Sequence, residues 1–126
     1  MKKQKIDELI FRAYHILNDV GIVKDGKIDS AWRAQISSFG AFIAHGSLLA
    51  AVSVFSAEGN AKVDRSKLMD AIAKLLGLNK PLFKYVEEAD RKVKESVLDA
   101  AIALKLAMNL YDLGKRESKN DNIKKD

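Results

Sequence analysis

The two histidines are the side chains best suited to acid–base or metal chemistry in this chain, and neither has a partner at a useful spacing. His15 and His45 are the only histidines, and cysteine is absent. Metal sites often place their ligands in patterns such as HExxH or His-x-His, and neither pattern occurs here, nor does either histidine have a Glu at metal-ligand spacing. We predict instead that His15 pairs with Asp19 one helical turn later, and that His45 caps or packs at a helix end.

The sequence patterns for nucleophilic catalysis and phosphate binding are also missing. Ser37 and Ser38 have no base within sequence reach, and no glycine-rich loop follows a predicted strand. Acidic residues within 87–90 could bind a divalent cation, but basic residues one turn later account for them as a solvated helical face. We therefore predict a protein that is not an enzyme and that uses no cofactor or metal.

Composition favours one helical domain. The chain has 126 residues, of which 48% are hydrophobic and one is proline. About 100–200 residues is the usual size of one domain, and this length buries a core without disulfides. Stretches rich in alanine and aliphatic residues favour helices over a β-sandwich. We predict an all-α fold with a single domain over residues 1–114 and a disordered polar tail over 115–126.

The charge distribution permits an acidic partner without requiring one. The net charge is +5, and the excess lies at the two ends of the chain: three lysines in residues 1–5 and a net +2 in 115–126. Short basic clusters elsewhere suit contacts to a phosphate backbone. Aromatic residues do not alternate with these clusters, which argues against stacking on nucleic-acid bases.

Hydrophobic periodicity predicts a compact bundle of five to six helices with a long C-terminal helix. Residues 22–28 are expected to form a loop that turns on Asp25-Gly26. The last helix has a second apolar stripe in its second half, which predicts burial on two sides. The expected helices cover approximately 6–20, 29–46, 47–58, 64–76, 81–86 and 87–113, and the second stripe begins at Leu98 and continues through Ile102, Leu106, Leu110 and Leu113.

Residues 34–61 contain a single charged side chain, Glu58. At the average charge density of this chain such a segment would contain about eight or nine charges, so most of its surface must be shielded from water. It is either a central core hairpin, the reading that we favour, or a partly exposed assembly surface. A membrane span is disfavoured because the apolar part, 39–55, is short and interrupted by His45-Gly46-Ser47. We expect a cytoplasmic protein with no membrane partner.

Two basic residues stand alone in apolar surroundings. Arg33 follows Trp32 at the start of the uncharged segment, and Lys105 interrupts the apolar run 100–108. Each must extend its charge from an apolar surface into water or meet an anion of a partner. Arg91 and Lys94 are added as candidate anion contacts because they lie in a cluster of basic residues.

Several stretches resemble the helices of the small, fifth subunit of the type III-B CRISPR Cmr effector complex, a RAMP-module assembly of antiviral defence. An aromatic-basic pair opens one helix, a break precedes the next, and a Leu-Lys pair lies in the closing helix. The similarity extends over residues 3–113. The matching positions are Trp32-Arg33, residues 36–43, Leu48, Ala51, Val52, residues 82–85 and residues 100–107.

The resemblance implies a non-catalytic helical subunit, several copies of which stack along backbone subunits and hold the guide–target duplex through phosphate contacts. Arg33 and Lys105 match basic positions of the family. The implied partners are the other Cmr subunits, neighbouring copies of the chain, and the guide and target RNA backbones, with no small-molecule substrate. The alternative is a helical adaptor or dimerisation module that has no nucleic-acid role and uses the uncharged hairpin as its partner surface.

Overall fold

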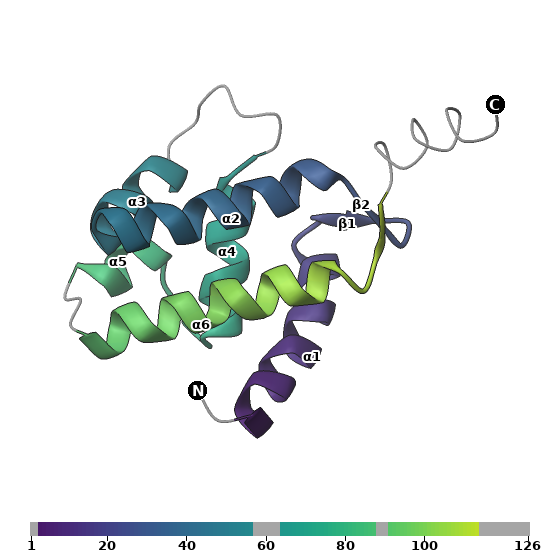
Figure 1. Ribbon diagram of the computed structural model, residues 1–126, viewed down its shortest axis with the longest axis horizontal. Coiled ribbons are helices and arrows are strands. Elements are labelled where there is room, and N and C mark those ends of the chain that lie inside the picture. The colour runs from purple at the N-terminus through teal and green to yellow at the C-terminus, as the bar shows by residue number, and fades with distance from the viewer. Residues whose placement is uncertain (1–2, 57–63, 88–90, 114–126) are drawn as a thin grey trace.

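The computed structural model describes residues 3–56, 64–87 and 91–113, which form six helices and three two-residue strands (Figure 1). The all-α prediction is confirmed, including the long C-terminal helix. The predicted tail over 115–126 lies outside the described residues. The elements are α1 (Lys3–Asp19), β1 (Val23–Lys24), β2 (Lys27–Ile28), α2 (Ser30–His45), α3 (Leu48–Ser56), α4 (Ser66–Leu75), α5 (Leu82–Val86), α6 (Arg91–Met108) and β3 (Asp112–Leu113).

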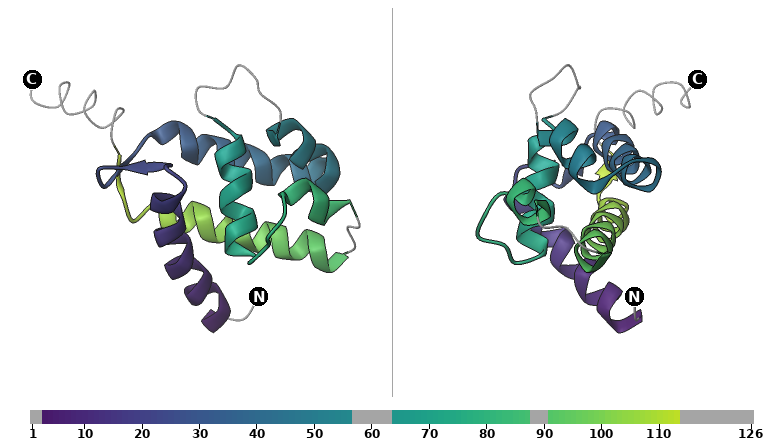
Figure 2. Two further views of the ribbon diagram at one scale, coloured as in Figure 1. Left: turned by 180° about the vertical axis from the view of Figure 1, so that it is seen from behind. Right: turned by 90° about the vertical axis from the view of Figure 1, so that its left-hand side faces the viewer.

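Helices α2 and α6 lie side by side and run in opposite directions. α4 and α5 lie behind them, and α1 crosses the C-terminal half of α6 (Figures 1 and 2). α6 is the central element, because it packs against α1, α2 and α4, while α3 packs against α2, α4 and α5. One cluster of buried apolar side chains connects all six helices.

Local sequence signals set the ends of the helices. The carboxylate of Asp29 accepts a hydrogen bond from the backbone N–H of Ala31 at 2.9 Å, and the hydroxyl of Ser47 accepts one from Ala50 at 3.0 Å. These bonds satisfy backbone donors that a helix start leaves free. Gly77 ends the turn after α4 with a φ of +73°, a conformation that glycine adopts without a steric penalty.

The segment 22–28 turns on Asp25-Gly26 as predicted, but it forms a β-hairpin with two short strands, which the loop prediction missed. Asp25 and Gly26 have φ values of +54° and +75°, the pair of positive angles that a two-residue hairpin turn requires. Val23 pairs with Ile28 across this turn, and Ile28 also pairs, in parallel, with Leu113 after α6. The small sheet therefore joins the start of α2 to the end of α6.

The prediction for the last helix is wrong in two respects. α6 ends at Met108, and the chain then turns into β3 instead of continuing as helix to residue 113. The second apolar stripe is only partly buried: Leu98 packs against the core, whereas Ile102, Leu106 and Leu110 are 50%, 41% and 62% exposed. The neighbouring helices cover the opposite side of α6, so the three exposed residues, the α6 stripe, have no cover within the described part of the chain. No helix in the described ranges is both long and apolar enough to cross a membrane.

Candidate functional site

Arg33 and Lys105 lie at the same end of the molecule. Arg33 is half-buried in the first turn of α2, next to the buried Trp32, and Lys105 is exposed in the last turn of α6. The two helix ends are held together because β2 immediately precedes α2, β3 follows α6, and these strands pair. The fold thus places two cations that are 72 positions apart in the sequence on neighbouring helix ends.

Arg91 and Lys94 are exposed in the first turn of α6, at the opposite end from Lys105. At 1.5 Å of rise per residue, Arg91 and Lys105 are about 21 Å apart along the helix axis. The four predicted contacts therefore form two pairs at opposite ends of the α2–α6 pair. Within the described residues, none of the four lies within 4.0 Å of a carboxylate.

The α2–α3 hairpin has one buried face and one exposed face. The two interpretations of the uncharged segment, a core hairpin and a partly exposed surface, therefore each describe one side of it. Ile36, Phe39 and Ile43 of α2 and Val52 and Phe55 of α3 are buried in the core. The opposite side is exposed and has no charged residue between Ala34 and Ser56. We call this side the outer face of α2–α3; it includes Ala34, Ser37, Ser38, Ala41, Phe42, Ala44, Leu49, Ala50, Ser53 and Val54.

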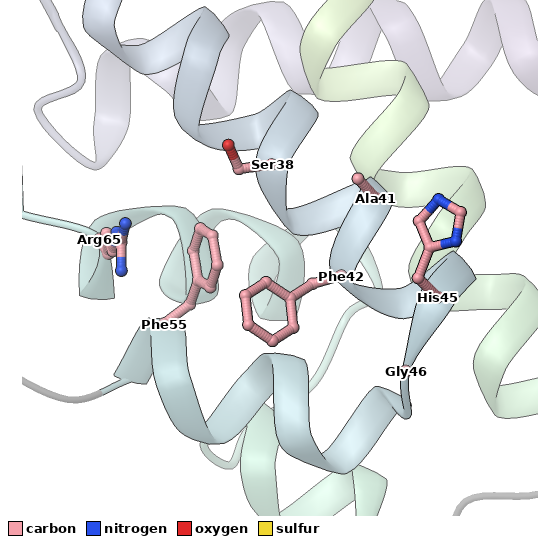
Figure 3. Close-up of a pocket in the computed structure, with 7 residues that line it drawn as sticks. All are labelled: Ser38, Ala41, Phe42, His45, Gly46, Phe55 and Arg65. Atoms are coloured by element: carbon pink, nitrogen blue, oxygen red, sulfur yellow. The ribbon is translucent and has the colours of Figure 1, made fainter.

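A cavity of about 520 Å³ lies at one edge of this outer face, between α2, α3 and the residue that precedes α4 (Figure 3). Phe42 is 43% exposed, whereas Phe55 behind it is buried. The helix break at Gly46 shapes one end, because a Cβ there would lie only 3.0 Å from the carbonyl oxygen of Phe42. The lining residues are Ser38, Ala41, Phe42, His45, Gly46, Phe55 and Arg65.

Arg65 is held in place by two contacts with the α2–α3 hairpin. Its Nε donates a hydrogen bond of 2.7 Å to the side-chain oxygen of Gln35, and its guanidinium carbon lies 4.5 Å from the centre of the Phe55 ring. The neighbouring Asp64 accepts hydrogen bonds from the backbone and hydroxyl of Ser66. The hydroxyl bond is the main reason that the pKa of Asp64 is lowered, so its negative charge is stabilised at the start of α4.

His45 lies at the end of α2 as predicted, but His15 does not pair with Asp19. His15 makes edge-to-face contacts with the rings of Phe11, at 5.0 Å, and Tyr14, at 5.5 Å, and it forms no ion pair with Asp19. His45 is exposed and lines the cavity, while the backbone N–H of Gly46 bonds the Phe42 carbonyl and closes α2.

A second contact that sequence reasoning missed joins α1 to the end of α6. The rings of Tyr14 and Tyr111 are stacked, 4.4 Å apart and nearly parallel, and the Tyr111 hydroxyl donates a 2.6 Å hydrogen bond to the backbone oxygen of Tyr14. Burial raises the pKa of Tyr111 to about 12, with further contributions from Tyr14 and Asp19. No local signal reveals this pair, because its members are 97 positions apart.

The described residues combine an exposed, charge-free face with single cations, and two groupings typical of catalytic sites do not occur among them. Ser38 and His45 both line the cavity, yet no hydrogen bond joins them or any other serine–histidine pair among the described residues. In the same ranges, no group of three His, Asp or Glu side chains converges to hold a metal. No family model matches the chain, and neither a curated protein nor a solved structure matches it significantly.

Proposed function

We propose that the protein is a non-catalytic structural subunit of an RNA-guided CRISPR type III-B interference complex. In this role it packs along the backbone subunits and stabilises the guide–target RNA through phosphate contacts. The proposal starts from the sequence resemblance over residues 3–113. Its main structural support is the outer face of α2–α3, which is exposed and uncharged in a protein that is 31% charged.

An exposed, charge-free face is typical of a surface that another protein covers. The α6 stripe supplies a second uncovered apolar surface on a different helix. A monomer gains nothing by exposing large apolar side chains at two places, whereas a subunit with more than one neighbour buries both. The geometry thus agrees with a chain that contacts partners on several sides.

The four cations suit contacts that do not depend on RNA sequence. Arg33, Lys105, Arg91 and Lys94 lie at the two ends of α2 and α6, and long basic side chains at such spacing can reach separate phosphates. A subunit of a guided complex must accept any guide, so backbone contacts without base recognition are what this role requires.

The test is co-expression of the chain with the proteins encoded beside its gene. We expect a complex that contains RNA. Replacement of the four cations by glutamine should weaken target-RNA binding by the assembled complex and reduce its salt dependence by up to about three to four counterions. The matched control replaces four other exposed lysines, Lys24, Lys27, Lys74 and Lys80, and should change binding much less. Recovery of neither RNA nor neighbouring subunits would refute the proposal.

The adaptor or dimerisation role is the second candidate, and the α6 stripe is the observation that favours it. It predicts that the purified chain forms a concentration-dependent dimer that salt and RNA do not affect. Replacement of Ile102 and Leu106 by serine should then yield a monomer in sedimentation experiments. Because Ile102 is 50% exposed and Leu106 is 41% exposed, the same change should lower the thermal stability moderately without unfolding the protein.

A further inference from the structure

We propose that the cavity between α2, α3 and Arg65 binds an apolar segment of another polypeptide that has a single carboxylate, and that this carboxylate pairs with Arg65. The inference rests on the proposed function because it specifies the chemistry of one partner in the assembly. It goes beyond that function by placing a protein contact, rather than an RNA contact, at a defined residue.

Arg65 is positioned to receive a carboxylate. Its Nε is bonded to Gln35 and one side of its guanidinium lies against Phe55, which fix the plane of the group. The two terminal nitrogens form no hydrogen bond or ion pair among the described residues. A guanidinium held in this way presents two parallel N–H donors, the geometry that a carboxylate accepts with both oxygens.

The rest of the cavity favours an apolar group. Ala41, Phe42 and Phe55 line the space with carbon atoms, and the ring of Phe55 lies between Phe42 and Arg65 (Figure 3). Ser38, Ala41, Phe42 and His45 recur at spacings of three and four along α2, so they lie along one side of that helix. The small side chains of Ser38 and Ala41 leave room for a second segment to lie against α2.

The charge around the cavity suits a protein ligand better than a nucleic acid. Arg65 is the one permanently charged group among the described residues that line the cavity, and α2 and α3 have no charge from Ala34 to Ser56. A nucleic-acid strand brings a phosphate with every nucleotide and needs several cations. Phosphates placed on this neutral surface would lose water without gaining partners. A peptide segment with one carboxylate among apolar side chains matches both the single charge of Arg65 and the neutral lining of the cavity.

The experiment titrates the isolated full-length chain with two synthetic peptides and follows it by ¹⁵N NMR, including the Nε–H of Arg65. The first peptide is acetyl-Ser-Ala-Leu-Glu-Ala-Leu-Ser-amide, and the second has Gln in place of Glu. We expect shifts at Phe42, Gly46 and Arg65, with binding of the Glu peptide about tenfold tighter than that of the Gln peptide. Arg65→Gln should remove this difference.

Two further variants keep the proposal testable if Arg65→Gln fails to fold. Ala41→Leu fills the cavity without changing its charge and should abolish binding of both peptides. Ala34→Leu makes the same change at an exposed position of α2 that does not line the cavity, and should bind normally.

Three results would overturn the inference: equal binding of the Glu and Gln peptides, unchanged binding by Ala41→Leu, or tighter binding of adenosine monophosphate than of the Glu peptide. The last result would assign the cavity to a nucleotide. These readings do not depend on recovery of neighbouring subunits, so failure of the cavity proposal and failure of the proposed function can be told apart.

Discussion

Replacement of Tyr111 by phenylalanine tests whether the contact between α1 and the end of α6 stabilises the fold. The change removes the hydroxyl that donates to the Tyr14 carbonyl but keeps the ring that stacks on Tyr14 at 4.4 Å. An ordinary intramolecular hydrogen bond contributes about 0.5–1.5 kcal/mol. We therefore expect Tyr111→Phe to lower the free energy of unfolding by about 1 kcal/mol at neutral pH, with the fold unchanged.

The pH dependence of this difference gives a sharper test than its size. The pKa of Tyr111 is raised from 10.0 to about 12 in the folded protein, so the folded state favours the protonated hydroxyl. Its contribution is complete below pH 10 and is lost as the pH rises from 10 to 12, because the unfolded state releases its proton first. A shift of two units would correspond to about 2.7 kcal/mol for a fully shielded group, and solvent screening at this partly exposed site reduces it to about 1 kcal/mol.

The assay is urea unfolding of the wild type and of Tyr111→Phe at several pH values between 7 and 11.5. Other tyrosines and lysines titrate in both proteins, so their effects cancel in the difference. We expect the difference to be constant up to about pH 9.5 and to shrink above it. A difference that is absent at pH 7 would show that the hydroxyl contact does not contribute to stability, and a difference that stays constant to pH 11.5 would show that folding does not raise the pKa of Tyr111.

Three further substitutions test the core, a helix start and a turn. Phe39→Ala should lower the free energy of unfolding by about 3–5 kcal/mol, because Phe39 is fully buried. Phe11→Ala is the control and should change this free energy by less than about 0.5 kcal/mol, because Phe11 is 68% exposed. Thermal unfolding of the two variants measures both effects. Asp29→Ala removes the cap of α2 and should cost about 1 kcal/mol, with Asp29→Asn as the control that keeps an acceptor. Gly77→Ala should cost about 1 kcal/mol through its positive φ alone, since no neighbouring atom obstructs a Cβ there; an equal stability of both proteins in urea would contradict this.

The helices were predictable because their signals are local. A cap such as Asp29 or Ser47 bonds a backbone group two or three residues away, so the sequence around it contains all the information needed. The hairpin at Asp25-Gly26 also had a local signal, and the strands escaped notice because each is only two residues long. β3 has no local signal of its own, because it exists only where Leu113 meets Ile28.

The candidate contacts were predictable to a lesser degree. Arg33 and Lys105 were singled out because a charge in an apolar run is visible in the sequence. Arg65 was not, because its significance comes from Gln35 and Phe55, which only the fold places beside it. The α6 stripe shows the opposite error: periodicity reveals that one side of a helix is apolar, but it does not reveal whether anything covers that side.

The parallel pairing of β2 with β3 has a consequence for the order of folding. It joins residues that are 85 positions apart in the sequence, so we expect the strands to meet after α2 has docked on α6. The entropy lost on closing a loop grows only logarithmically with the length of the loop. Once the packed helices hold the two strands close together, the pairing of two short strands can offset the entropy that remains to be lost. The sheet should therefore form last and open first, while the helical core stays intact. In native-state hydrogen exchange, the amides of the sheet should then exchange earlier than those of the helical core.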